Sequence, residues 1–219
     1  MSLSLVVRRT AALIGVAAPL AAGMLSAQEP EIPPPVEVTP FIGYYLGGGL
    51  YQKGDATATL ADAVTFGGRL AWILSPTFGV ELTYARTDPD LRLPSTTQPG
   101  TFEVVGDVTL DQLDLDAQIG YSTPREMLYL AFGPGLVRFS PTITGADAGR
   151  NTRASANVGL GYKRFFGALG LRLEGRYRGV FTGRATDIDI SCGGTTGCYT
   201  YSKQVFSSAE FTAGLTARF

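Results

Sequence analysis

The sequence predicts an all-β fold, an eight-stranded antiparallel up-and-down β-barrel that crosses a membrane. Three observations lead to this prediction. Apolar and polar residues alternate with a period of two over many segments, as they do in strands with two different faces. The connections expected between these segments alternate between short and long. After Ala27 the chain has no run of 18 apolar residues, so any crossing of a membrane must use strands.

Composition excludes several classes of function. Of the 219 residues, 45% are hydrophobic and 17% are charged, which is too apolar for an intrinsically disordered chain. Eighteen basic and 19 acidic residues give a formal net charge of −1, so nothing favours a nucleic-acid partner. The chain has no histidine, which excludes Ser–His–Asp and Cys–His catalysis and His-ligated metals. We expect no cofactor, no metal site and no enzymatic activity.

Residues 1–27 have the layout of a secretory signal peptide. Two arginines supply the positive start, an apolar stretch from Ala11 to Leu25 follows, and small residues lead to Ala27 as the last residue removed. The alternative is a membrane anchor helix, but the apolar stretch is shorter than the roughly 20 residues that span a bilayer. Residues 28–40 hold five of the 13 prolines and form a Pro-rich lead-in, because proline blocks both helix and central strand. Residues 41–219 then form one β-barrel domain.

Alternation is clearest in residues 169–178. Leucines and a tyrosine fall on one face, while Arg172, Glu174, Arg176 and Arg178 fall on the other. The same pattern reaches the last residue of the chain, Phe219. Eight strands are expected, at residues 36–52, 62–74, 78–88, 103–121, 127–140, 152–165, 168–181 and 203–219.

The lengths of the connections indicate a membrane barrel. An even number of strands brings both termini and the short turns to one end, and leaves the longer links, near 53–61, 89–102, 141–151 and 182–202, at the other. This asymmetry is typical of transmembrane barrels, whose sheet must close because lipid pairs no backbone group. Aromatics also gather near both strand ends, as in interfacial girdles, although aromatics favour strands in general. The expected girdles are Trp72, Phe78, Tyr121, Tyr162, Phe165 and Phe219 at the short-turn end, and Tyr51, Phe66, Tyr84, Phe139, Phe181 and Phe206 at the long-loop end.

The ending TAGLTARF resembles the C-terminal signal of bacterial outer-membrane barrels. That signal has a polar residue, a glycine two places on, spaced apolar residues and a final aromatic, and Thr212, Gly214, Ala217 and Phe219 fill those places. The run LSPTFGVELTY, from Leu74, looks like the first periplasmic turn and next strand of small barrels similar to OmpA, OmpX and OmpW. The resemblance implies the bacterial outer membrane, contact with its lipid, and recognition of the last strand by the barrel-assembly machinery. We expect a monomer, and the sequence names no partner for the loops.

The polar faces carry ten charged residues that point inward if the apolar faces meet lipid. The interior of an eight-stranded barrel is just wide enough for its side chains, and an unpaired charge there is costly. Five acids and five bases predict an ion-pair network that fills the lumen, with an ion pathway as the alternative. A catalytic pair at Asp114 and Asp116 is disfavoured, because nearby arginines keep both ionised. The ten residues are Arg69, Glu81, Asp114, Asp116, Arg172, Glu174, Arg176, Arg178, Glu210 and Arg218.

Partners for the arginines of residues 169–178 are expected on other strands. Residues two apart on one face are separated by about 6.6–7 Å along the strand, so they should not neutralise one another. Glu210 on the adjoining last strand is the nearest candidate.

Cysteine and glycine supply two smaller expectations. Cys192 and Cys198 are the only cysteines, and two cysteines in the longest loop of an exported chain predict a disulfide. Zinc is the alternative, weakened by the absence of histidine. Glycine clusters such as GPG at 133–135 are followed by no helix, so we interpret them as relief of crowding in a curved sheet rather than phosphate loops.

Two functional classes fit these features best. The preferred one is an integral outer-membrane barrel with a structural or surface-interaction role, its lumen plugged by charge and its long loops displayed outside. The alternative is a small channel or binding barrel for small or apolar solutes, as the resemblance to OmpW-like barrels implies. A barrel enzyme is disfavoured because outer-membrane lipases, proteases and lipid A deacylases commonly use a histidine, which this chain lacks. A soluble lipocalin-like carrier is disfavoured because no glycine stands two places before Trp72.

Overall fold

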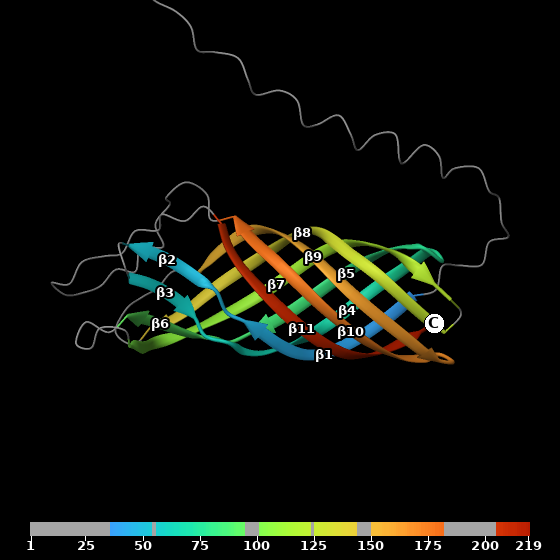
Figure 1. The fold of residues 1–219 in the computed structure, drawn as a ribbon, viewed down its shortest axis with the longest axis horizontal. Helices are drawn as coiled ribbons and strands as arrows, with labels where there is room; N and C mark the ends of the chain where they lie inside the picture. The colour runs from blue at the N-terminus through green and yellow to red at the C-terminus, as the bar shows by residue number, and fades with distance from the viewer. Residues whose placement is uncertain (1–35, 54–55, 95–100, 124, 144–149, 182–204) are drawn as a thin grey trace, which may run out of the picture. The chain divides into compact units, whose positions relative to one another are not determined.

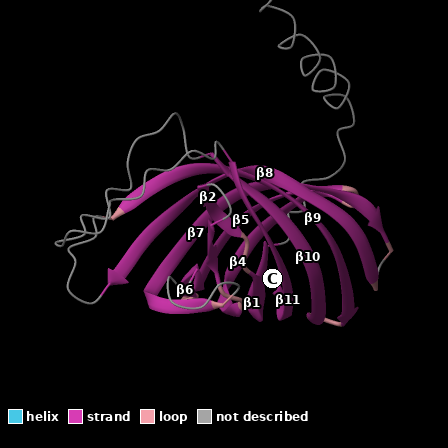
Figure 2. Cartoon of the chain, turned by 60° about the vertical axis from the view of Figure 1, so that its left-hand side comes forward, coloured by secondary structure: helices cyan, strands magenta, loops and turns pink. Residues whose placement is uncertain are grey.

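The computed structural model describes residues 36–53, 56–94, 101–123, 125–143, 150–181 and 205–219. Residues 1–27, Cys192 and Cys198 lie outside these ranges. Within them the chain consists of strands and short connections, as Figure 2 shows. The described residues contain no helix that is long and apolar enough to cross a membrane.

Eight antiparallel strands close into a barrel, which confirms the predicted fold class (Figure 1). The strands follow one another around the barrel in chain order, and the last one pairs with the first. Each of the eight strands is therefore paired with a strand on both sides, as a sheet in lipid requires. The barrel strands are β1 (Val36–Leu46), β4 (Ala63–Ser75), β5 (Phe78–Thr87), β7 (Phe102–Ser122), β8 (Glu126–Ile143), β9 (Asn151–Phe166), β10 (Leu169–Phe181) and β11 (Val205–Arg218).

The stagger of the strands follows from their register. A path that starts at Val36 and moves from each residue to its partner on the next strand returns to β1 at Leu46, ten residues further along. A stagger of ten over eight strands tilts the strands by about 40° to the barrel axis. Residues at one height are therefore displaced by about one residue per strand from their register partners. The path runs through Val36, Trp72, Val80, Ala117, Phe132, Val158, Tyr177, Ala209 and Leu46.

Three further strands extend the sheet beyond the barrel at the long-loop end. They are β2 (Gly49–Lys53), β3 (Ala56–Leu60) and β6 (Asp90–Pro94), joined in the order β2–β3–β6–β7 (Figure 1). The interpretation of 53–61 and 89–102 as links was therefore wrong, because β3 and β6 lie within them. The expected strand 36–52 is likewise two strands.

Local sequence explains why these strands break from the barrel. The breaks fall at Gly47–Gly48, Ala61–Asp62 and Asp88–Pro89. A side chain on Gly47 would lie 2.0 Å from the carbonyl oxygen of Leu60, so glycine permits the close approach of the two segments. The Gly47 N–H also donates to the Asp62 carboxylate at 2.9 Å. Pro89 has no N–H to continue the ladder.

Short turns join the strands at the opposite end. β9 and β10 are joined by Gly167 and Ala168, with Gly167 at a φ of 79°. Two-residue hairpin turns favour glycine there, because their twist requires positive φ. β1 starts at Val36, where the expected strand 36–52 also starts, so residues 36–40 of the Pro-rich lead-in belong to the sheet.

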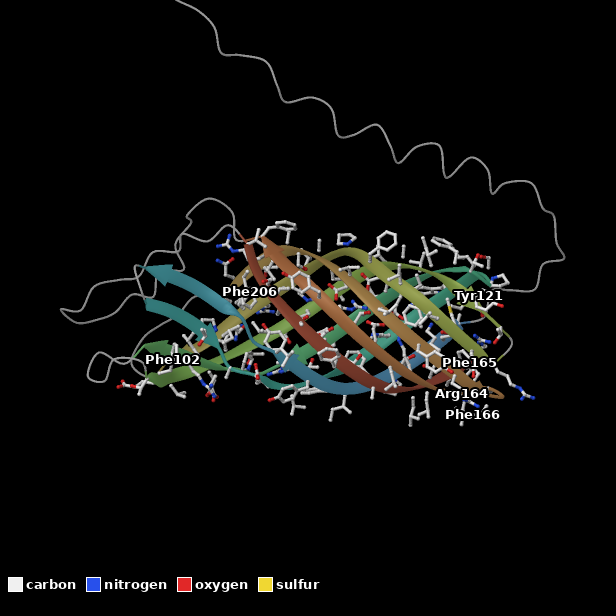
Figure 3. All side chains as sticks on the ribbon, viewed as in Figure 1. Phe102, Tyr121, Arg164, Phe165, Phe166 and Phe206 are labelled. Atoms are coloured by element: carbon white, nitrogen blue, oxygen red, sulfur yellow. The ribbon has the colours of Figure 1, made fainter. Side chains whose placement is uncertain are left out.

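The outer face of the barrel is apolar and carries aromatic residues near both ends. Tyr121, Phe166 and Phe219 are 63–80% exposed near the short turns (Tyr121 and Phe166 in Figure 3), and Phe66, Tyr84 and Phe181 are about half exposed toward the long loops. Three members of the expected girdles face inward instead. They are Phe139, Phe165 and Phe206, each less than 8% exposed.

Candidate functional site

The candidate site is the barrel interior, which is charged over most of its length. Nine of the ten charged residues singled out from the sequence are almost completely buried there, on strands β4, β5, β7, β10 and β11. Arg218 lies at the short-turn end with its side chain 31% exposed. We call the interconnected set, together with Glu37 and Lys163, the charge network. It is built by alternation: the residues between its members face outward.

Glu81 and Glu174 form the centre of the charge network. Arg172 holds Glu81 with both terminal nitrogens, one of them at 2.8 Å, and also donates to Glu174 at 2.5 Å. Arg69 reaches Glu174 at 3.2 Å from the far wall of the barrel. The Gln118 amide adds a hydrogen bond of 2.7 Å to Glu81. Bidentate Arg–carboxylate pairs of this kind combine strength with fixed geometry.

Arg176 and Arg178 bind the two aspartates on β7. Arg176 contacts Asp116 at 2.7 Å and Asp114 at 3.1 Å, while Arg178 grips Asp114 with two nitrogens at 2.5 and 2.8 Å. Glu210, although directly opposite Arg176 in register, lies 3.8 Å from Arg176 and 4.0 Å from Arg178. Glu210 is therefore the weakest partner of these arginines rather than the first.

Glu174 corrects the expectation that residues of β10 do not pair with one another. It lies between Arg172 and Arg176 on the same strand face and binds the second at 2.8 Å. The long arginine side chains bend along the strand and close the gap that the backbone leaves. One carboxylate thus serves three arginines, counting Arg69.

A buried tyrosine completes the central layer. The Tyr129 hydroxyl donates to Glu174 at 2.6 Å, and its ring lies 5.0 Å from both the Lys163 ammonium and the Arg172 guanidinium. Both cations are within the range of a cation–π interaction. Gly161, the register partner of Tyr129, has no side chain, and a Cβ there would lie 2.1 Å from the ring.

The GPG motif makes space for the aspartates. A Cβ on Gly133 would lie 2.7 Å from the Asp116 carboxylate, and one on Gly135 would lie 2.0 Å from that of Asp114. Because these two glycines have no side chains, the carboxylates can lie directly against the backbone of β8. Close approach of another group is one reason for glycine within a strand.

Glu37 and Lys163 also belong to the charge network, although the alternation of the expected strands did not single them out. Lys163 binds Glu37 at 2.6 Å and Gln118 at 3.0 Å, and Arg218 binds Glu37 at 2.7 Å. Glu37 falls in both the Pro-rich lead-in and the expected strand 36–52, but neither Glu37 nor Lys163 was placed on a face. Alternation in β9 could have found Lys163, because its neighbours Tyr162 and Arg164 both face away from the lumen side.

The interior changes from charged to apolar at the long-loop end. Nine buried side chains form what we call the apolar cluster, including Leu60 and Leu91 from the strands that extend beyond the barrel. The rings of Phe139 and Phe206 meet edge to face with centroids 6.5 Å apart. The members are Tyr45, Leu60, Leu91, Val108, Leu110, Val137, Phe139, Val180 and Phe206.

No protein-family model matches the sequence, and neither does any curated protein. Solved structures do resemble the fold. The outer-membrane protein OprG from Pseudomonas aeruginosa matches with a TM-score of 0.62 and 10% identity, over 85% of this chain and 96% of OprG. The fold is that of the small outer-membrane β-barrels. Neisserial surface protein A matches with a TM-score of 0.51 and 15% identity, over 84% of this chain and 97% of that one.

The small outer-membrane barrel fold explains the distribution of side chains. Lipid accepts only apolar groups on the outside, so polar residues collect in the lumen, where they must be paired. The described residues contain no group of three carboxylates or cysteines arranged to hold a metal ion. Each carboxylate of the charge network except Glu210 accepts a direct hydrogen bond from a cation of the network.

Proposed function

We propose that this chain is an integral outer-membrane barrel with a structural or surface-presenting role. On this proposal the signal peptide of residues 1–27 is removed on export, the monomeric barrel lies in lipid, and the long connections are presented at the cell surface. The closed sheet, its apolar outer face and the likeness in fold to OprG support it.

The composition of the lumen carries the proposal. Among the described residues, six carboxylates and six cations of the charge network lie inside the barrel, so their formal charges cancel. Ions moving along the lumen would have to separate pairs whose atoms are 2.5–3.2 Å apart in a space filled by side chains. We infer that the network is the core of the barrel and closes it. The carboxylates are Glu37, Glu81, Asp114, Asp116, Glu174 and Glu210, and the cations are Arg69, Lys163, Arg172, Arg176, Arg178 and Arg218.

Conductance of the refolded protein in planar bilayers tests this proposal. The wild-type barrel should show no stepwise conductance. The double variant Glu81→Ala/Arg172→Ala removes a bidentate pair at the centre of the charge network together with its volume, and should admit ions. Thr65→Val, which changes a buried residue nearer the long-loop end, should stay closed. Sustained conductance of the wild type would instead establish the lumen as an ion pathway.

A second candidate function is the binding of small apolar solutes at the long-loop end, and the apolar cluster favours it. A purely structural lumen of paired charges does not require nine apolar side chains above it. The wall beside the cluster is also incompletely paired: β1 pairs with β11 only as far as Leu46 and Ala209, whereas β10 continues on β11 to Val205. Excess partition of octane into protein-containing over empty lipid nanodiscs tests this function. Leu110→Asn should abolish the excess.

A further inference from the structure

The boundary between the charge network and the apolar cluster contains polar atoms without partners. Thr87 Oγ1, Gln112 Oε1, Ser155 Oγ and Asn157 Oδ1 are buried and make no hydrogen bond. All four residues are less than 7% exposed. Native proteins leave few such atoms unpaired, so four in one region require an explanation.

These four side chains lie together on one side of the barrel. Gln112 on β7 faces Ala85 on β5, two residues from Thr87, and Ser155 on β9 faces the bare Gly135 of β8. With the stagger of about one residue per strand, Thr87, Gln112 and Ser155 come to one height. Asn157 lies two residues further toward the short-turn end on the lumen face of β9.

Apolar side chains stand directly above this polar group on the same strands. Leu110 precedes Gln112 by two residues on β7, and Val137 and Phe139 follow Gly135 on β8. All three belong to the apolar cluster. The wall is therefore amphipathic along the barrel axis, with hydrogen-bonding atoms below and hydrocarbon above.

The chemistry of the unpaired atoms defines the group that they would bind. The amide oxygens of Gln112 and Asn157 only accept hydrogen bonds, while the two hydroxyls can donate or accept. The surroundings carry no excess charge, because Arg178 and Arg176 are already bound to Asp114 and Asp116. A matching group is uncharged and donates hydrogen bonds, as a hydroxyl does.

We propose that this boundary binds the head group of an uncharged, hydroxyl-bearing amphiphile, whose hydrocarbon chain lies along the apolar cluster. The proposal rests on the second candidate function and narrows its ligand from apolar solutes in general to amphiphiles with a donor. Gln112, Asn157, Thr87 and Ser155 bind the head, and Leu110, Val137 and Phe139 contact the chain.

The proposal is tested in nanodiscs by labelling the protein with a photoreactive octanol and measuring how well other compounds compete with this probe. The probe carries a diazirine in its chain, and mass spectrometry identifies the labelled peptide. Labelling should fall on the segments with Leu110 and Phe139. At equal free concentration, 1-octanol should compete about tenfold better than 1-methoxyoctane, which keeps the oxygen but loses the donor, since about 1.4 kcal/mol separates them. Octanoate and octylammonium should compete less well than octanol, because each adds a charge to a neutral lumen.

Variants separate the head-group site from the chain site. Gln112→Leu/Ser155→Ala should keep the labelling and lose the preference for octanol over its ether. Thr65→Val is the matched control, because its hydroxyl already donates to the Arg86 carbonyl, and it should keep the preference. Equal competition by octanol and ether in the wild type would overturn the inference and leave the apolar-solute function standing. A preference for a charged competitor would also overturn it. Absence of specific labelling would overturn both this inference and the apolar-solute function. Water would then be the partner of the unpaired polar atoms.

Discussion

Glycine residues determine where the large inward side chains can lie. Gly161 is the clearest case, because the Tyr129 ring occupies the space that a side chain at this position would need. Gly159, two residues earlier on the same face, is different: the nearest atoms to a Cβ there are 3.3 and 3.5 Å away. The pair therefore separates the effect of a clash from that of glycine itself.

Gly161→Ala should destabilise the barrel by about 1–3 kcal/mol, because the added methyl group forces Tyr129 away from Glu174. Gly159→Ala should cost less than about 1 kcal/mol, since its contacts need only a small adjustment. The free energy of unfolding by urea in lipid bilayers measures both. Equal losses of unfolding free energy in the two variants would show that the Tyr129 ring can move aside without cost.

Glu174 and Glu210 should differ sharply although both are buried carboxylates. Glu174→Ala removes the direct hydrogen bonds that Arg69, Arg172 and Arg176 make to this carboxylate. Glu81 then remains as the only network carboxylate within 4.0 Å of all three, and for two of them at 3.7 Å, so the loss should cost about 3–5 kcal/mol. Glu210→Ala removes ion pairs whose atoms are 3.8 and 4.0 Å apart and should cost about 1 kcal/mol or less. Urea unfolding measures both free energies. A loss of stability in Glu210→Ala as large as that in Glu174→Ala would contradict the weak pairing of Glu210.

At the scale of strands, alternation predicts the two faces of each barrel strand. Leu160 is 57% exposed on the outer face of β9, between Gly159 and Gly161 on the lumen face. It lies near the middle of the apolar outer surface, whereas Tyr121 lies at the short-turn end.

Leu160→Arg should cost about 2–4 kcal/mol, because it places a charge near the bilayer midplane. Tyr121→Arg should cost about 0–1 kcal/mol, since an interfacial arginine stays hydrated. Unfolding in bilayers measures the difference. An unchanged free energy of unfolding in Leu160→Arg would show that this face does not meet lipid.

The C-terminal residue, Phe219, leads to a separate prediction. Phe219 is 80% exposed, and its backbone N–H donates to Val36 O at 2.9 Å. Deletion of Phe219 should impair assembly in cells while changing the unfolding free energy of the refolded barrel little. Fractionation measures the first effect and urea unfolding the second. Wild-type amounts of the truncated protein in the outer membrane would argue against the assembly-signal interpretation.

For the whole molecule, closure is the property that matters most. A closed barrel has no free edge among its eight wall strands, so it should resist sodium dodecyl sulfate until it is boiled. The folded protein should therefore migrate faster on a gel than the boiled protein, and its circular dichroism should be dominated by sheet. A single band at the unfolded position after refolding into lipid would contradict closure.

The sequence could not predict the features of the long-loop end. The rule of apolar outside and polar inside fails there, because the lumen itself becomes apolar around Phe139 and Phe206. Both were therefore assigned to the outer girdle. The strands β3 and β6 are only five residues long and follow glycine, aspartate and proline, which normally indicate loops.

By itself the sequence determined the class of fold, the approximate positions of the eight wall strands and the face of the charged residues that it singled out. Those properties depend on local alternation and turn residues, which each segment carries on its own. Only the tertiary structure decided which charges meet. Glu81 and Arg172 are 91 residues apart, and Glu37 and Lys163 are 126 apart. They come together because a stagger of ten residues sets the height of every strand against the others, and no single strand encodes that stagger.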